Sequence, residues 1–323
     1  MGLHPSVAAV RLAVRRTLSD LGSGETVVVA CSGGADSLAL LAATVFEARR
    51  DSWRVVGATV DHGLQPGSTE QADRVAEQMR SIGVEESLTA RVHVEAPGLG
   101  PEAAAREARY AVLGQVAERF AAATVLLGHT LDDQAETVLL GLARGSGGRS
   151  LAGMRRRFDD YRRPLLDVRR AETEAACVAE GIDFWTDPHN SDDRFTRVRV
   201  RTRVLPLMER ELGPGVAAAL ARTAESIRLD VDLLDDLAEA AEPELRVEGG
   251  HDVDLLVEQP TAILRRVLRL AALAAGALSA DLAHEHVLAL VEMVQAHPQR
   301  QVQLPGHVTA HVEDAILRFR RTT

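Results

Sequence analysis

Short apolar runs alternate with longer amphipathic stretches through the first part of the chain, and this alternation constrains the fold most. Runs rich in valine, threonine and leucine predict strands at 26–30, 54–60, 88–94 and 124–128. Stretches with helical periodicity lie between and after them at 36–50, 68–82, 101–121 and 130–143. Strands separated by helices are typical of βαβ units, so the sequence predicts an α/β fold with a doubly wound parallel sheet.

A change of pattern divides the chain near Gly213, Pro214 and Gly215. Before this cluster, a further helix is expected at about 168–181, followed by an arginine-rich segment at 195–212. After it, the periodicity predicts helices at about 216–241, 261–274 and 281–297, then two or three short strands within 301–320. We therefore expect a larger domain at 1–213 and a smaller C-terminal α+β domain at 216–323.

The composition excludes several classes of chemistry. All 37 basic residues are arginine, so neither a Schiff-base lysine nor the lysine of a G-x-x-x-x-G-K-[ST] loop is available. The two cysteines, Cys31 and Cys177, form neither a disulfide framework nor a C-x-x-C pair. No run approaches the roughly 20 apolar residues of a membrane span, and no signal peptide is recognisable, so a cytoplasmic location is expected.

Charge is distributed unevenly along this acidic chain. The formal net charge of -10 argues against nucleic-acid binding by bulk attraction. However, residues 144–163 hold seven arginines against two acids, and residues 194–210 hold six against one. The segment 144–163 also contains glycines, Phe158 and Tyr161, so it could bind RNA phosphates and stack an extruded base. The alternative is an ordinary solvated surface.

The first predicted strand leads directly into Cys31-Ser-Gly-Gly-Ala-Asp-Ser37 and then into a helix. Gly33 and Gly34 would let backbone N–H groups approach an anion at the positive end of the helix. The hydroxyls of Ser32 and Ser37 add donors, and Ala35 lies between them. Asp36 would repel phosphate unless a cation intervened, which predicts a Mg²⁺ ligand. The alternative is an ordinary helix cap.

A second group of polar residues follows the fourth predicted strand. His129, Asp133 and Glu136 share one stripe at helical periodicity, and Asp132 lies beside them. This position is the usual ligand edge of an open α/β sheet. Capping by Thr130 and Asp133 could explain one acid but not three acids with a histidine.

The loop Ser32–Ser37 resembles the S-G-G-x-D-S motif of the PP-loop ATP pyrophosphatases. Further motifs resemble the tRNA(Ile)-lysidine synthases of this group, over about 26–210, in a short form with one C-terminal domain. They are Val60-Asp-His-Gly-Leu64, Arg106-Glu-Ala-Arg-Tyr110, Leu127-Gly-His-Thr-Leu-Asp-Asp-Gln-Ala-Glu-Thr137, Arg144-Gly-Ser-Gly147, Leu151-Ala-Gly-Met154, Arg163-Pro-Leu-Leu166 and Trp185-Thr-Asp-Pro188.

The resemblance implies a two-step reaction on the CAU-anticodon isoleucine tRNA. ATP adenylates the C2 carbonyl of the wobble cytidine, and free lysine then displaces AMP to give lysidine. ATP and Mg²⁺ would bind at Ser32–Ser37, with Asp61 and His62 near the adenine. A possible homodimer and a tRNA-positioning C-terminal domain are also implied.

Within this reaction, Asp133 and Glu136 suit the lysine ammonium, while either Asp132 or His129 could serve the proton or the metal. Arg109 becomes a candidate for ATP phosphates or tRNA. Helical phase places Arg201 on an apolar face, where it needs an anionic partner, either a carboxylate or a phosphate. Val198 replaces an asparagine of the family pattern.

Two rival functions remain from the sequence. A PP-loop tRNA thiolase would need sulfur-carrying cysteines or an iron–sulfur cluster, which Cys31 and Cys177 do not provide. A non-catalytic nucleotide-binding regulator would have no reason to place carboxylates opposite the phosphate loop.

Overall fold

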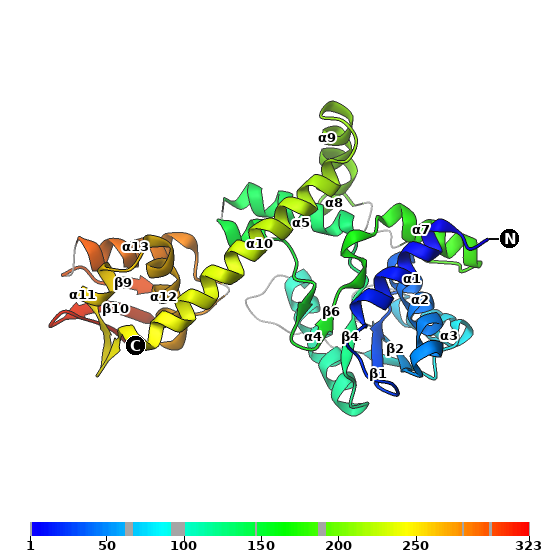
Figure 1. The fold of residues 1–323 in the computed structure, drawn as a ribbon, viewed down its shortest axis with the longest axis horizontal. Helices are drawn as coiled ribbons and strands as arrows, with labels where there is room; N and C mark the ends of the chain where they lie inside the picture. Colours follow the sequence, from blue (N-terminus) through cyan, green and yellow to red (C-terminus); the bar gives the residue numbers. More distant parts are fainter. Residues whose placement is uncertain are drawn as a thin grey trace. The chain divides into compact units, whose positions relative to one another are not determined.

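Valine-rich stretches form the centre of a six-stranded sheet, as seen in a computed structural model of the chain (Figure 1). The structure describes residues 2–61, 67–91, 101–145, 147–186, 192–279, 281–296 and 299–322, without the side chains of 101–105. The strand order is β3-β2-β1-β4-β6-β5. All neighbouring pairs are parallel except β5 with β6. The strands are β1 (Thr26–Ala30), β2 (Arg54–Asp61), β3 (Glu86–Arg91), β4 (Thr124–Leu126), β5 (Arg157–Phe158) and β6 (Tyr161–Arg162).

Helices cover both faces of this sheet, which confirms the predicted doubly wound α/β fold. Successive residues of β1 face opposite sides, so Val27 and Val29 join one hydrophobic cluster and Val28 joins another. Figure 1 shows one group of helices beside one face and α4 beside the other. The first group is α1 (Pro5–Thr17), α2 (Ala35–Asp51), α3 (Ser68–Ile82) and α7 (Arg170–Glu180), and α4 is Pro101–Arg119.

Several elements, among them α1, β5 and β6, were not predicted from the sequence. Helix α1 buries Val7, Val10 and Val14 against the sheet domain. The pair β5–β6 extends the sheet within the basic segment 144–163, for which no strand was predicted. The predicted strand at 88–94 corresponds to β3, and residues 92–94 lie outside the described residues.

The remaining segments of the first unit complete the ligand edge of the sheet. Helix α5 follows β4, and a short 3-10 turn lies between β6 and α7. After α7, the arginine-rich segment forms one continuous helical stretch with a π-helical middle. These elements are α5 (Leu131–Arg144), Pro164–Asp167 (3-10), α8 (Thr196–Arg199), Val200–Val204 (π) and α9 (Leu205–Glu211).

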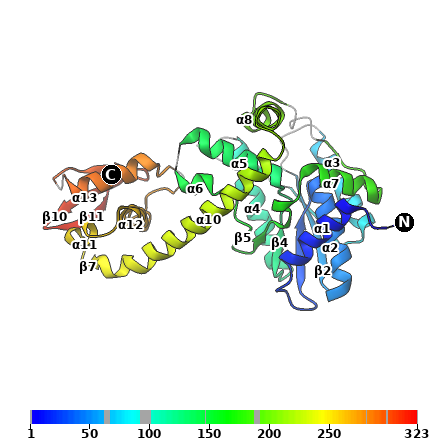
Figure 2. The same cartoon turned by 45° about the horizontal axis from the view of Figure 1, so that its top comes forward.

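A second, five-stranded antiparallel sheet with helices beside it forms the C-terminal part (Figure 2). Its order is β7-β8-β11-β10-β9, and its core contains Leu264, Leu268, Leu290 and Leu317. The elements are α6 (Gly148–Leu151), α10 (Val216–Ala241), β7 (Arg246–Val247), β8 (Gly250–Asp252), α11 (Val253–Val257), α12 (Thr261–Ala274), α13 (His284–Gln295), β9 (Val302–Leu304), β10 (Val308–Glu313) and β11 (Ile316–Arg321).

The chain divides into two units, each composed of two separate stretches. Unit 1 comprises Met1–Thr137 and Met154–Ala221, and unit 2 comprises Val138–Gly153 and Arg222–Thr323. The chain passes from one unit to the other inside α5 and inside α10. The units therefore have other bounds than the segments 1–213 and 216–323. Among the described residues, no helix is both long and apolar enough to cross a bilayer.

Candidate active site

The phosphate loop between β1 and α2 is held by the hydroxyl of Ser37. This buried hydroxyl accepts the backbone N–H of Ser32 at 3.1 Å and donates to the carbonyl of Gly34 at 2.9 Å. The hydroxyls of Ser32 and Ser37 are 3.3 Å apart. Ala35 begins α2 directly after Gly34, so the loop delivers its polar groups to a helix N-terminus.

Glycines allow the close packing of this loop. Gly33 has φ +82°, and a Cβ there would lie 2.5 Å from Cγ2 of Val75. Gly128, at the end of β4, packs against the start of α2. A Cβ on Gly128 would meet the backbone of Asp36 and Ser37 at 3.2 Å. The loop before α2 and the loop before α5 are therefore in direct contact.

Four carboxylates and four arginines meet at this edge. Glu136, whose side chain is fully buried, receives Nε of Arg201 at 2.7 Å and Nε of Arg197 at 3.1 Å. Oδ1 of Asp133 accepts hydrogen bonds from Nη2 of Arg170 at 2.7 Å and from Nη2 of Arg201 at 3.2 Å. The other pairs are Arg170 with Asp36 at 3.5 Å, Arg170 with Glu136 at 3.4 Å and Arg169 with Asp132 at 3.0 Å.

The capping alternative and the site interpretation both apply to Asp133. Its Oδ2 accepts the backbone N–H and the hydroxyl of Thr130, each at 2.9 Å, while its Oδ1 faces the arginines. Burial opposes ionisation of Asp133, but Arg170, the Thr130 N–H and Arg201 together lower its pKa. Asp133 is therefore an ionised cap that also holds two guanidiniums.

Asp36 connects the phosphate loop to this cluster. Its Oδ1 accepts the hydroxyl of Thr173, and its Oδ2 faces Arg170. Burial raises the pKa of Asp36 to about 6, and the charge of Asp133 adds to the rise, while Thr173 and Arg170 oppose it. A carboxylate in such surroundings favours a bound cation.

The residues present fit Mg²⁺ held jointly with a nucleotide. Mg²⁺ usually binds one or two protein carboxylates together with substrate phosphates, and Asp36 beside the phosphate loop supplies one carboxylate. Among the described residues, no group of three or more His, Cys, Asp or Glu side chains is arranged as a self-sufficient metal site.

His129 stands apart from the carboxylate–arginine pairs. It precedes α5, and its Nδ1 accepts Nε–H of Arg163 at 3.2 Å. Burial and the nearby guanidiniums of Arg163, Arg109 and Arg106 together lower the pKa of His129 to about 3, against the charge of Asp133.

The remaining predicted residues lie at the margins of this cluster. The carboxylate of Asp61, at the end of β2, is buried and receives Arg91 and Thr69 at 3.2 Å each. Arg109 lies on α4 with its guanidinium 6.0 Å from the ring centre of Tyr110. His62 lies outside the described residues.

The arginine-rich stretches engage protein partners to a large extent. Arg156 and Arg157 pair with Asp167 and Asp20, at 2.7 and 3.2 Å. Phe158 and Tyr161 stack on each other with ring centres 5.1 Å apart and also pack against Tyr110. The expected base-stacking surface is therefore part of the protein's own aromatic cluster.

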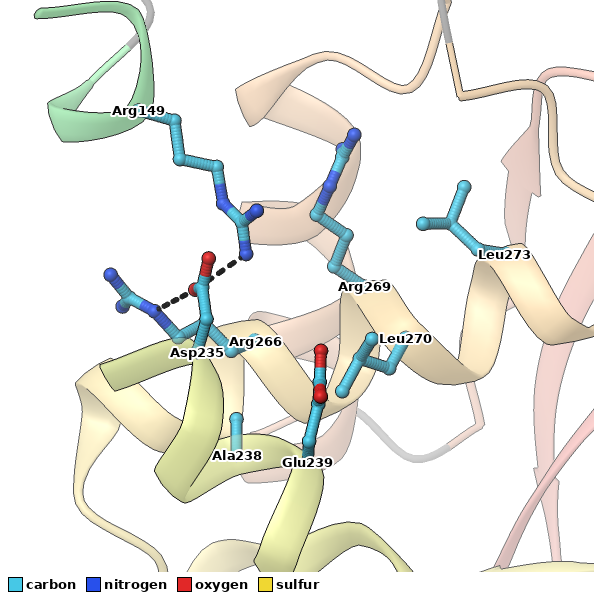
Figure 3. Close-up of a pocket in the computed structure, with 8 residues that line it drawn as sticks. All are labelled: Arg149, Asp235, Ala238, Glu239, Arg266, Arg269, Leu270 and Leu273. Atoms are coloured by element: carbon cyan, nitrogen blue, oxygen red, sulfur yellow. Dashed lines mark hydrogen bonds and ion pairs between the residues drawn. The ribbon is translucent and has the colours of Figure 1, made fainter. Parts of the chain in front are cut away.

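The pocket in unit 2 is a charged contact between helices (Figure 3). Asp235 of α10 receives Arg149 of α6 at 2.6 Å and Arg266 of α12 at 2.8 Å. Arg269 also lines the pocket and donates to the carbonyl of Leu282 at 2.8 Å. Because the acidic helix α10 supplies Asp235 and Glu239, we interpret these arginines as its structural counter-charges.

Sequence reasoning missed Arg170, Thr173 and Arg163 as parts of the site. Arg170 alone contacts Asp36, Asp133 and Glu136. It lies at the start of α7, where no local pattern distinguishes it from neighbouring arginines. Its only sequence signal is an arginine pair, Arg169–Arg170, at a predicted helix start.

Comparison with known proteins identifies the family. The PP-loop domain model matches residues 10–208. A tRNA(Ile)-lysidine synthase from Thermobifida fusca is 52% identical, covering 94% of both chains. The chain belongs to the tRNA(Ile)-lysidine synthase family. A second member, from Streptomyces coelicolor, is 46% identical over 99% of this chain and 100% of that protein.

One solved structure resembles this chain in its fold alone. It is the U34-tRNA thiolase NcsA from Methanococcus maripaludis with its 4Fe-4S cluster. The TM-score is 0.58 at 18% identity, covering 69% of this chain and 80% of that chain. Membership of the lysidine synthase family establishes the chain as an enzyme of the PP-loop group, which uses ATP.

Proposed function

We propose that the enzyme forms lysidine on the CAU-anticodon tRNA(Ile) in two steps, by adenylation of C2 of the wobble cytidine and displacement of AMP by free lysine. The products are then the modified tRNA, AMP and pyrophosphate. The observation that carries this proposal is the contact between the phosphate loop and a group of buried carboxylates, because the reaction needs both a polyphosphate site and an ammonium site.

For the first step, the Ser32–Ser37 loop binds the departing pyrophosphate. Backbone N–H groups and the two serine hydroxyls are the donors, and Asp36 would hold Mg²⁺. Mg²⁺ supplies charge neutralisation for the leaving group when bound. Asp61 and His62 belong to the adenine side of this proposed site, and Arg109 to its phosphate or tRNA side.

For the second step, Asp133 and Glu136 bind the ammonium group of lysine. The structure places guanidiniums of Arg170, Arg197 and Arg201 on these two carboxylates. Lysine entry therefore requires that a guanidinium be exchanged for the ammonium. Arg197 suits this exchange because its side chain is 37% exposed, more than those of the other two arginines, and incoming phosphate could attract it.

The proposal extends to partners and location. Free lysine and the tRNA are its substrates, and the C-terminal domain at 216–323 positions the tRNA. We also propose a homodimer and a cytoplasmic location, as the family resemblance implies. Light scattering of the purified protein tests the homodimer, since a single mass of 34.8 kDa would exclude it.

One incubation tests the reaction itself. The protein is mixed with ATP, Mg²⁺, labelled lysine and bulk bacterial tRNA, and the nucleosides are then analysed. Labelled lysidine together with equimolar AMP supports the proposal. Sulfur incorporation from a sulfur donor in place of lysine would favour a thiolase, and nucleotide binding without pyrophosphate release would favour a regulatory protein.

A further inference from the structure

The ring of His129 is held in one protonation form by Arg163. A guanidinium can only donate hydrogen bonds, so Nδ1 of His129 must be the acceptor in the 3.2 Å contact with Nε of Arg163. In a neutral imidazole the other nitrogen then carries the proton. His129 therefore presents Nε2–H, and within the described residues this group donates no hydrogen bond.

Arg163 is rigidly placed for this task. Only 5% of the residue is exposed. Its Nη1 donates to the carbonyl of Arg155 at 2.6 Å, and its Nη2 donates to the hydroxyl of Tyr110 at 3.4 Å. Its guanidinium also lies over the ring of Phe158, 4.3 Å from the centre. These contacts come from α4 and from the stretch 155–158, and together they fix the direction of Nε–H.

The charges around His129 keep its ring neutral. Arg163 from the segment after β6 and Arg106 and Arg109 from α4 face it with positive charge, and Asp133 from α5 faces it with negative charge. Burial and the three cations together lower the pKa of His129 to about 3. A pKa near 3 corresponds to a neutral ring at neutral pH and to a weak base.

The neighbourhood indicates where Nε2–H is needed. Gly128, directly before His129, packs against the backbone of Asp36 and Ser37 in the phosphate loop. Gly128 therefore places the backbone of His129 one residue from the contact with the phosphate loop. A neutral N–H donor on this segment is suited to an oxygen of the nucleotide, as donors placed toward developing charge are in other enzymes.

We propose that His129 is a neutral hydrogen-bond donor to a phosphate oxygen of the bound nucleotide, and that Arg163 is the positioning residue that fixes its Nε2–H form. The identity of the acceptor depends on the proposed function, whereas the Nε2–H form does not. This assignment removes His129 from the choice between His129 and Asp132 for the proton.

Substitutions at His129 test the donor role. The amide nitrogen of glutamine can replace Nε2–H, so His129→Gln should keep pyrophosphate release within about tenfold of the wild type. His129→Leu has no donor and should lose at least about a hundredfold. Equal, nearly complete losses in both variants would show that the ring acts as a base and would overturn the proposal.

The Nε2–H form is tested without turnover. In protein carrying ¹⁵N-labelled histidine, the signals of His129 are assigned by their disappearance in His129→Gln. We expect the Nε2–H form with no titration between pH 5 and 8. A Nδ1–H form, or a midpoint near 6.5, would contradict the proposal even if no lysidine is formed by the protein.

Arg163 variants separate positioning from general stability. Arg163→Met should raise the midpoint of His129 and lower kcat for pyrophosphate release more than it changes KM for ATP. Arg163→Lys should restore part of kcat, because an ammonium can still donate to Nδ1. The control is Arg156→Met, since Arg156 pairs with the exposed Asp167 and should leave the His129 signals unchanged. Unchanged His129 signals in Arg163→Met would contradict the positioning role.

Discussion

At the residue scale, the site is a balance of buried charges. Asp36, Asp132, Asp133 and Glu136 are matched by four arginines, and each carboxylate has at least one guanidinium within 3.5 Å. Removal of one partner from a buried pair leaves an uncompensated charge, which typically costs several kcal/mol. The carboxylates therefore serve the fold as well as the proposed chemistry.

Asp36→Asn should stabilise the ligand-free protein at neutral pH while it abolishes most pyrophosphate release. The folded pKa of about 6 lies above the unfolded value of 3.8, so the carboxyl favours the fold when protonated and loses this contribution as pH rises through 6. Two pKa units correspond to a gain for asparagine of up to about 3 kcal/mol above pH 6.

The measurement is the melting temperature of both proteins in EDTA from pH 4 to 8. The difference should be small near pH 4, grow between pH 4 and 6, and stay constant above pH 6. The lowered pKa of His129 makes stability depend on pH in the opposite direction. This contribution is the same in both proteins, so it cancels in the difference between their melting temperatures. A difference that is constant with pH would mean that Asp36 does not titrate in this window.

Glu136→Gln should impair lysine use far more than ATP binding, because only lysine brings an ammonium to this carboxylate. It should also lower the free energy of unfolding by about 3 to 5 kcal/mol, since three guanidiniums lose a partner. Lysine KM, kcat and ATP affinity are measured alongside urea unfolding.

The matched control for this variant is Glu47→Gln. Glu47 is 3% exposed and pairs with Arg15 through two bonds of 2.8 and 2.9 Å, outside the cluster. It should lose stability without a specific change in lysine KM. If Glu136→Gln and Glu47→Gln have the same kinetic profile, Glu136 has only a structural role.

Local motifs made some site residues predictable and left others hidden. Asp36, Asp133 and Glu136 were predicted because they lie within short motifs next to predicted strand ends. Arg201 was predicted to face inward, and its bonds to Glu136 and Asp133 confirm a protein carboxylate as its partner. Arg163 and Arg170 depend on contacts with segments 34 to 37 residues earlier, which periodicity cannot reveal.

At the element scale, the π-helical segment within the arginine-rich helix alters which later residues lie on its buried face. The apolar face predicted from helical phase, on which Arg201 was placed, consists of Val198, Leu205, Met208 and Leu212; Val198 and Leu205 are buried. Leu212 is 71% exposed, which corrects that part of the prediction. The π-helical segment Val200–Val204 has wider turns than an α-helix and shifts the phase of later residues, and the helix ends at Glu211.

Gly141→Ala should destabilise the protein although alanine is the better helix former. A Cβ at Gly141 of α5 would lie 2.3 Å from the backbone oxygen of Ser150, so α6 would have to move. We expect a loss of about 1 to 3 kcal/mol, as in overpacked cores. Urea unfolding measures the change.

Gly114→Ala on α4 is the matched comparison. Its nearest neighbour would be the hydroxyl of Tyr161 at 3.8 Å, which is an ordinary contact. This variant should gain up to about 1 kcal/mol from helix propensity. A gain in both variants would show that α5 and α6 do not require this close approach.

Most long elements followed directly from periodicity, whereas short ones depended on tertiary contacts. The predicted bounds of α3, α10 and α12 agree with the structure to the residue. The pairs β5–β6 and β7–β8 have strands of only two or three residues, so their sequences contain too few alternations to recognise.

At the scale of the whole molecule, the Gly213–Gly215 cluster is not a point where the chain can be cut cleanly. Glu209 accepts the backbone N–H groups of Gly215, Val216 and Ala217, and these bonds lower its pKa. Unit 2 also needs the distant stretch 138–153, whose carbonyls at Ala152 and Gly153 receive Arg228.

The fragment 216–323 expressed alone should therefore be less stable than the same part in the full chain. It loses the cap from Glu209 and the pair of Asp235 with Arg149. Circular dichroism and urea unfolding of this fragment, and of a version fused to 138–153, provide the comparison. Equal stability of the two fragments would show that 138–153 contributes nothing to unit 2.

The reactivity of the two thiols can report transient local opening of the nucleotide domain. Cys31 lies 3.7 Å from the hydroxyl of Ser37, and Cys177 donates to the carbonyl of Ala35 at 3.4 Å. Both are buried, and burial raises the pKa of each, to about 12 for Cys177. Since thiolates are the reactive species, alkylation must await transient opening around the loop. If added ATP slows alkylation, the ratio of the two rates measures how strongly the bound nucleotide suppresses opening of the loop. The chain has no lysine side chains that could react with the reagent in place of these thiols.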